Sequence, residues 1–207
     1  DVDSFVNYYI TAELFRITDV SYSSVRYFIK KSADGTEKLY AGPLWDLDLS
    51  SGNADGAAAD PDNDMHAQDN PWFGALMKNK EFAAKVTERF NEVLPEIKKL
   101  TADGGVIDTL VSTLRKSIDA NYSTLAYHKY SIDATGVNTG WGIDKLYTAG
   151  EHECSTAEEA RATGNVSGSL NIYDNYDAYL NDFKSYLSGR TEYLKKQFDA
   201  TDYEEVL

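Results

Sequence analysis

The sequence predicts a single domain that is mainly α-helical, with a small antiparallel β-hairpin toward its N-terminal side. Three observations support this fold class. Apolar side chains recur at helical spacing in stretches 81–100, 106–123 and 173–200. Two short β-prone runs flank the turn sequence Ala33-Asp34-Gly35-Thr36. The 207 residues are 42% hydrophobic and 13% aromatic, which is enough to build one hydrophobic core.

Composition and charge exclude several classes of protein. The chain has 34 acidic and 20 basic residues, a net charge of −14, whereas binding a nucleic-acid backbone requires clustered Lys and Arg. No apolar run approaches the roughly 20 residues that cross a bilayer. Cys154 stands alone, so neither a disulfide framework nor a cysteine metal cluster is expected. We expect the histidines to lie on the surface without a functional role: His66, His128 and His152.

The chain opens on Asp1-Val2-Asp3 and enters a helical pattern directly. This opening lacks the basic and apolar regions of a signal peptide, and we interpret the sequence as part of a longer protein. Ser4 is the predicted N-cap of the first helix. The apolar stripe of that helix comprises Phe5, Tyr8, Tyr9, Ala12, Leu14 and Phe15. Glu13 interrupts this stripe. We interpret it as a charge exposed on the flank of the helix. The alternative is that it is buried and pairs with a cation or a backbone amide.

The first helix should end within 17–21, where β-branched and small polar residues favour irregular backbone. Strands are predicted at 25–30 and 38–45, joined by the Asp-Gly turn. The loop before the first strand and the loop after the second meet at one end of such a hairpin. The regions around Asp19 and Asp46 should therefore be neighbours.

Residues 51–70 have no periodicity and are predicted to form a long mobile loop. Their acidic stretch 60–64 resembles a calcium loop in composition, but it lacks the Gly and the Glu that an EF-hand requires at its sixth and twelfth positions. Pro71 begins a further helix. Pro95 should kink or divide the helix over 81–100, and Gly189 should interrupt the helix over 173–200. Loops are expected over 131–169, with a short helix at 155–162.

The stretch from Gly42 to Ser50, Gly-Pro-Leu-Trp-Asp-Leu-Asp-Leu-Ser, carries the clearest chemistry. On a strand, Asp46 and Asp48 would share one face. Two adjacent carboxylates repel each other unless a cation lies between them, and Mg²⁺ bound to phosphate oxygens takes such ligands. A solvated strand end is the alternative, because a chain with 34 acidic residues contains Asp-x-Asp pairs by chance.

The order of these features resembles a known family. A helix with Ser-Phe-Val-Asn-Tyr-Tyr-Ile-Thr-Ala-Glu-Leu-Phe leads to an Asp, and Tyr-Phe-Ile-Lys-Lys, an Asp-Gly turn and Leu-Tyr-Ala-Gly-Pro-Leu-Trp-Asp-Leu-Asp-Leu-Ser-Ser-Gly follow. The last helix carries Arg-Thr-Glu-Tyr-Leu-Lys-Lys-Gln-Phe. Together they resemble the C-terminal lobe of CotH-type proteins, the spore-coat family of atypical protein kinases. The resemblance covers residues 1–200, and 201–207 form a tail.

The resemblance implies roles for individual residues. Asp19 matches the catalytic aspartate, which accepts the proton of a substrate hydroxyl. Asp46 matches the aspartate that binds metal and nucleotide, and Asp48 is its companion in metal binding. Kinases place an Asn shortly after the catalytic Asp, and here Ser24 takes that cofactor-binding position. The implied cofactors are ATP with Mg²⁺ or Mn²⁺, and the implied partner is a surface or coat protein at the bacterial cell or spore surface or outside the cell.

The sequence contains no Gly-rich phosphate loop, and the local basic pair Lys30-Lys31 is interpreted as a solvated strand edge. The resemblance therefore implies an upstream nucleotide lobe, without which these residues should be inactive. Two alternatives stay open. One is a non-catalytic CotH-fold scaffold that binds protein or carbohydrate through its 15 tyrosines. The other is a metal-dependent glycosyltransferase using Asp46 and Asp48, although such enzymes place this motif after a parallel sheet with crossover helices.

Overall fold

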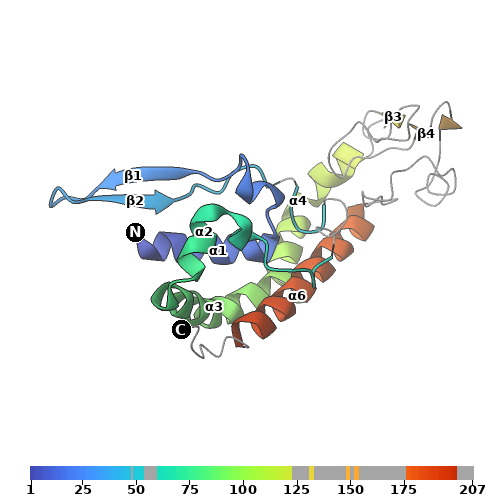
Figure 1. The fold of residues 1–207 in the computed structure, drawn as a ribbon. Coiled ribbons are helices and arrows are strands. Elements are labelled where there is room, and N and C mark those ends of the chain that lie inside the picture. Colours follow the sequence, from blue (N-terminus) through green and yellow to red (C-terminus); the bar gives the residue numbers. More distant parts are fainter. Residues whose placement is uncertain are drawn as a thin grey trace.

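The structure is a computed structural model that describes residues 1–47, 49–53, 60–122, 131–132, 148–149, 152–153 and 176–199. It is mainly helical with a two-stranded antiparallel ribbon (Figure 1), which confirms the predicted fold class. Helix α1 contacts both α3 and α6, and the ribbon projects from this helical body. The principal helices are α1 (Val2–Phe15), α2 (Pro71–Met77), α3 (Lys80–Thr101), α4 (Val106–Tyr122) and α6 (Tyr176–Asp199).

Helix α1 begins one turn earlier than predicted. Its N-cap is Asp1, whose Oδ1 accepts a hydrogen bond from Ser4 N at 3.0 Å, so the prediction of Ser4 as the cap was wrong. A carboxylate suits this position because it satisfies a free amide and faces the positive end of the helix dipole. Ser4 Oγ instead accepts a hydrogen bond from Ala41 N at 3.2 Å. This contact ties the ribbon to the first turn of α1.

The core is built around aromatic rings. Phe73 of α2 is fully buried, and its ring centroid lies 6.1 Å from Phe5, 5.6 Å from Tyr8 and 5.7 Å from Tyr9. Further along, Phe90 of α3 meets a ring of α6 at 4.7 Å. The apolar stripe predicted for α1 is therefore its buried face, and the core lies between α1, α2, α3 and α6.

Glu13 is fully buried, so its predicted exposure was wrong. Its Oε2 lies 2.8 Å from the NH2 of Arg190, and both side chains are 0% exposed. The carboxylate also accepts hydrogen bonds from the amides of His66 and Ala67, at 2.9 and 2.8 Å. Burial raises the pKa of Glu13, while Arg190 and these two amides act in the opposite direction. An apolar helix face tolerates this charge because α6 brings a cation to it.

Arg190 also fixes the segment that precedes α2. It donates from Nε to Glu13 O at 2.8 Å and from NH1 to Asn63 O at 2.6 Å.

Helix α6 is continuous through Gly189, contrary to the predicted interruption. A Cβ at Gly189 would lie 3.1 Å from the side chain of Pro61, so the glycine permits close packing. The loop expected to be mobile is thus held over 60–67, and 54–59 lie outside the described residues.

Other boundaries differ from expectation in smaller ways. Helix α3 runs through Pro95 without division, and a kink there, the other predicted outcome, stays a prediction. The region predicted as loops contains a three-stranded sheet of two-residue strands, β3 (Ser131–Ile132), β4 (Thr148–Ala149) and β5 (His152–Glu153). The helix predicted at 155–162 and the tail 201–207 lie outside the described residues. Within the described ranges, no helix is long and apolar enough to cross a membrane.

The ribbon pairs β1 (Tyr27–Lys31) with β2 (Glu37–Ala41), and Phe28 lies opposite Tyr40. At its turn, Gly35 has φ 86°, a conformation that glycine adopts without strain. Strand β2 ends at Ala41, four residues before the predicted end. Gly42 has φ 120°, which turns the backbone out of the extended region. The prediction that the strand reaches Trp45 was therefore wrong.

Candidate functional site

Asp19 lies in the 3₁₀ turn η1 (Thr18–Ser21), directly after α1. Arg16 ends α1 with φ 45°, and the chain reverses there. The carbonyl oxygen of Asp19 accepts hydrogen bonds from three consecutive amides, those of Tyr22, Ser23 and Ser24, at 3.0, 3.2 and 3.3 Å. The Asp19 side chain is half-buried. The turn therefore presents one carboxylate from a tightly bonded backbone.

Side chains of the following segment hold this turn in place. His66 Nε2 lies 2.9 Å from Thr18 O, and Asn70 Nδ2 donates to Val20 O at 2.8 Å. Because His66 contacts the turn and is largely buried, its predicted surface position was wrong. Asn70 is 2% exposed and also caps α2 by accepting from Trp72 N at 2.9 Å. His128 and the side chain of His152 lie outside the described part of the chain.

Asp46 lies on irregular backbone and not on a strand. It is exposed and has φ 62°, so the expected sharing of a strand face with Asp48 does not apply. Among the described residues, no cation or hydrogen-bond donor contacts the Asp46 carboxylate. Asp48 lies outside the described residues. The part of the chain that the structure describes contains no group of three or more His, Cys, Asp or Glu residues arranged to hold a metal.

Backbone hydrogen bonds join the two acidic segments. Thr18 N donates to Leu49 O at 3.2 Å, and Ser51 N donates to Phe15 O at 2.6 Å. Thr18 immediately precedes Asp19, and Leu49 lies three residues after Asp46. The loop before β1 and the loop after β2 therefore run side by side. How close the carboxylates of Asp19 and Asp46 come stays a prediction.

Several hydroxyl groups near the turn are buried without a described partner. Ser24 is 1% exposed, and its Oγ has none. Thr18 Oγ1, Ser21 Oγ and Ser51 Oγ are also buried and have no described hydrogen-bond partner. Buried polar groups without partners are uncommon in folded proteins, and they often mark places where water or an ion supplies the missing contact. The interior next to Asp19 is therefore lined by several hydroxyl groups.

Arg26 is a residue that the sequence analysis missed. Its guanidinium lies over the ring of Trp45, 5.7 Å from the centroid. Its NH1 donates to Ser23 O and, at 3.2 Å, to Val25 O. One signal could have found it, because Arg26 is the single basic residue in 17–28 and 42–53 together. It connects the loop of Asp19 to the residue before Asp46.

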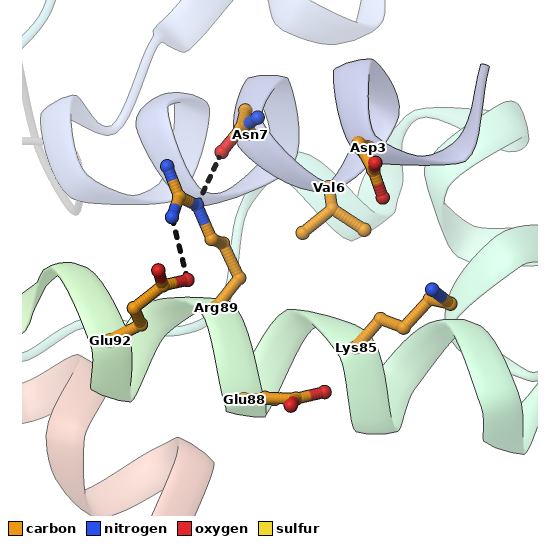
Figure 2. Close-up of a pocket in the computed structure, with 7 residues that line it drawn as sticks. All are labelled: Asp3, Val6, Asn7, Lys85, Glu88, Arg89 and Glu92. Atoms are coloured by element: carbon orange, nitrogen blue, oxygen red, sulfur yellow. Dashed lines mark hydrogen bonds and ion pairs between the residues drawn. The ribbon is translucent and has the colours of Figure 1, made fainter.

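A separate groove lies between α1 and α3 (Figure 2). It encloses about 350 Å³ and is lined by Asp3, Val6, Asn7, Lys85, Glu88, Arg89 and Glu92. Arg89 spans it, with Nε donating to Asn7 Oδ1 at 3.0 Å and NH1 to Glu92 at 2.6 Å. Its charges are mixed, and none of these residues belongs to the Asp19 turn or the Asp46 segment. We therefore place the candidate site at those two segments.

The fold and these contacts define a class: a mainly helical domain in which a ribbon joins an aspartate-bearing turn to an aspartate-bearing loop. The family model described as CotH kinase protein matches residues 1–194. The chain therefore belongs to the CotH kinase family, which confirms the resemblance in its sequence and indicates a kinase-like domain. Searches of the curated proteins and of the solved structures find no match to the chain.

Proposed function

We propose that residues 1–200 form the lobe of a CotH kinase that carries its catalytic and metal-binding aspartates. The reaction would be metal-dependent transfer of the ATP γ-phosphoryl group to a hydroxyl of a protein. The observation that supports this most directly is the hydrogen bond from Thr18 N to Leu49 O. It ties the turn of Asp19 to the segment that contains Asp46 and Asp48, as a shared catalytic centre requires.

The donor set fits a hard divalent cation. Asp46 offers an exposed carboxylate that contacts no cation within the described residues, and Asp48 follows two positions later. Mg²⁺ and Mn²⁺ prefer such oxygen ligands. Asp46 would hold the metal and the nucleotide phosphates, with Asp48 assisting. When bound, the cation would supply positive charge that offsets the charge of the nucleotide phosphates.

Asp19 is proposed as the base. Its carboxylate would accept the proton of the substrate hydroxyl as that oxygen bonds to the γ-phosphorus and the bond to ADP breaks. The hydrogen bonds from His66 and Asn70 would keep its turn in one position. Ser24, which is buried and donates its amide to Asp19 O, is proposed as a cofactor-binding residue. The protein substrate would be a surface or coat protein, at the spore or cell surface or outside the cell.

A non-catalytic scaffold of the same family is the second candidate. It is supported by the exposure of large aromatic side chains, among them Tyr22, Trp45 and Trp72, which suit binding of protein or carbohydrate. A glycosyltransferase lacks comparable support. Parallel pairing among the described strands is confined to the two-residue strands β3 and β4.

The test uses the full-length gene product that contains these residues. Calorimetry with ATP and Mg²⁺ or Mn²⁺ measures binding, and radiolabelled ATP measures transfer to protein. Asp46→Ala should weaken metal-nucleotide binding by roughly 100-fold or more, because it removes a direct ligand. Asp19→Ala should leave binding intact and lower transfer by about 10²–10⁴-fold, as expected for loss of a general base. Asp103→Ala, at an exposed loop carboxylate, is the matched control.

Two outcomes would overturn the proposal. Unchanged transfer in both variants would place the chemistry elsewhere, and a wild-type protein that binds no nucleotide would favour the scaffold. The lobe assignment has its own test, since residues 1–207 alone should bind ATP poorly without an additional cationic, Gly-containing phosphate segment. Tight ATP binding by these residues alone would contradict that assignment.

A further inference from the structure

We propose that Arg26 is a phosphate-binding residue of this site, contacting the polyphosphate of the bound nucleotide from the side of the Asp19 turn. This inference rests on the proposed function and adds a cationic contact within these residues. Phosphoryl transfer requires positive charge at the phosphates in addition to metal. The chain has a net charge of −14, and Arg26 is the single basic residue in the two segments that form the site.

The position of Arg26 links both segments. Its NH1 contacts Ser23 O, on the backbone that closes the Asp19 turn. Its guanidinium covers the ring of Trp45, the residue before Asp46. Its own carbonyl oxygen accepts from Gly42 N at 2.8 Å, where the Asp46 segment leaves β2. A ligand bound at Asp46 and approached by Asp19 would therefore lie beside this guanidinium.

Arg26 is exposed, and the described contacts of its guanidinium leave donors and charge available to a ligand. NH1 is bound to carbonyl oxygens, whereas Nε and NH2 contact no acceptor among the described residues. No described carboxylate lies within ion-pair distance of it. A cation–π contact with an indole and one bound nitrogen limit the freedom of the side chain, so less entropy is lost when the remaining N–H groups bind an anion. A planar fork with free donors matches phosphate oxygens well.

The other cations of the ribbon are less suitable. Lys31 is exposed and lies 3.7 Å from Glu37, and Lys38 lies 3.8 Å from Asp1. Lys30 is exposed and lies opposite Lys38. All three are several residues away along the strands from the end where Asp19 and Asp46 lie. The charge of Arg26 also affects the buried Tyr8. Burial raises the pKa of Tyr8, and the positive charge of Arg26 partly offsets that rise. Tyr8 OH donates to Ser24 O at 3.4 Å, so the guanidinium lies close to the turn.

The experiment compares ligands that differ in phosphate number on the full-length protein. Binding of ATP, ADP, inorganic tripolyphosphate and adenosine, each with Mg²⁺, is measured by competition with a fluorescent nucleotide. Arg26→Gln should weaken ATP and tripolyphosphate by roughly tenfold or more, the size of a lost hydrogen bond to a charged group, and leave adenosine unchanged. Arg26→Lys should recover part of the affinity, because it restores charge without the planar fork. Lys31→Gln, a charge loss on the same ribbon, should match wild type.

The outcomes separate this inference from the proposed function. If Arg26 only supports Trp45, Arg26→Gln will weaken adenosine and ATP equally and Arg26→Lys will give no rescue, which overturns the inference. If Asp46→Ala abolishes ATP binding while Arg26→Gln binds like wild type, the proposed function stands and the phosphate contact is refuted. If the wild type binds none of the four ligands, the proposed function itself fails. If Arg26→Gln weakens tripolyphosphate but not ATP, the residue binds free polyphosphate and not the nucleotide, which also refutes the inference.

Discussion

The Asp19 turn and the Asp46 segment differ in how firmly the fold holds them. His66, Asn70 and Leu49 all bond to the backbone of the turn. Asp46, in contrast, is exposed on left-handed backbone, and no described group contacts its carboxylate. A proton acceptor needs a fixed direction before substrate arrives, whereas a metal ligand gains its partner with the cation. This difference is the one that the proposed roles of Asp19 and Asp46 require.

The largest expected effect comes from removing the ion pair beneath the turn. Arg190→Ala would leave Glu13 as a buried charge without its cation and release the carbonyl groups of Pro61 and Asn63. We expect the free energy of unfolding to fall by about 3–5 kcal/mol. Denaturant titration of wild type and variant measures it.

Lys196→Ala is the control, since Lys196 is exposed on the same helix. It should change the free energy of unfolding by no more than about 0.5 kcal/mol. Equal, small losses in the two variants would show that the turn does not depend on this pair.

A smaller effect is expected at Asn70, which has two separable roles. Asn70→Ala removes both the N-cap of α2 and the donor to Val20 O, and it should cost roughly 1–3 kcal/mol of unfolding free energy. Asn70→Asp keeps the cap acceptor but places a buried carboxylate oxygen where the amide donated to Val20 O, so it should cost at least as much as Asn70→Ala. Both variants should accelerate hydrogen exchange at the amides of Tyr22, Ser23 and Ser24. Unaltered exchange in both variants would mean that Asn70 does not hold the turn.

Sequence reasoning succeeded where structure depends on local pattern. The helical spacing in α3 and α6 and the Asp-Gly turn of the ribbon are properties of short stretches, and the structure confirms them. It failed where a distant residue decides. Nothing near Glu13 shows that Arg190, 177 positions away, will meet it in the core. Likewise, the sequence predicts a helix break at Gly189, whereas the structure shows that the glycine allows Pro61 to pack against the helix.

The candidate site shows the same division. The hairpin correctly predicted that the segments around Asp19 and Asp46 would be neighbours, because a ribbon returns the chain to its starting end. The strand-face argument for Asp46 failed because Gly42 and Asp46 both take positive φ. The roles of His66 and Arg26 depend on backbone carbonyl groups, which a pattern of side chains does not reveal.

Asp108 is a carboxylate with a cationic partner, in contrast to Asp46, and its contribution to stability should depend on pH. Lys184, at 2.7 Å from Asp108 Oδ1, holds the pKa of Asp108 below its ordinary 3.8, and the amide of Gly104 acts in the same direction. The folded state therefore binds this proton less tightly than the unfolded state. Its stabilising contribution is full above about pH 3.8 and is lost as the pH falls through the lower folded pKa.

Asp108→Asn should accordingly lower stability slightly at pH 7, and the difference from wild type should shrink at about pH 3. Thermal unfolding at the two pH values measures it. A difference that is independent of pH would show that Asp108 acts through packing and not through its charge.

The smallest expected effect on stability is at Asp46. Asp46→Asn should change the unfolding free energy by less than about 0.5 kcal/mol without metal, since no contact with a described residue is lost and asparagine tolerates left-handed backbone. With Mg²⁺ and ATP, wild type should gain stability by ligand linkage and the variant should gain much less. A loss above about 1 kcal/mol in the absence of metal would mean that Asp46 has a structural partner.

The central claim is that one metal site at Asp46 faces the turn of Asp19. Anomalous diffraction from Mn²⁺, in crystals of the full-length protein with a non-hydrolysable ATP analogue, tests it directly. We predict an Mn²⁺ peak in contact with the Asp46 carboxylate, with the carboxylate of Asp19 on the same side of the ribbon and within roughly 10 Å of it, the span of a metal, a phosphoryl group and a nucleophile. A peak confined to the acidic stretch 60–64, or Asp19 on the opposite face of the ribbon, would contradict the account.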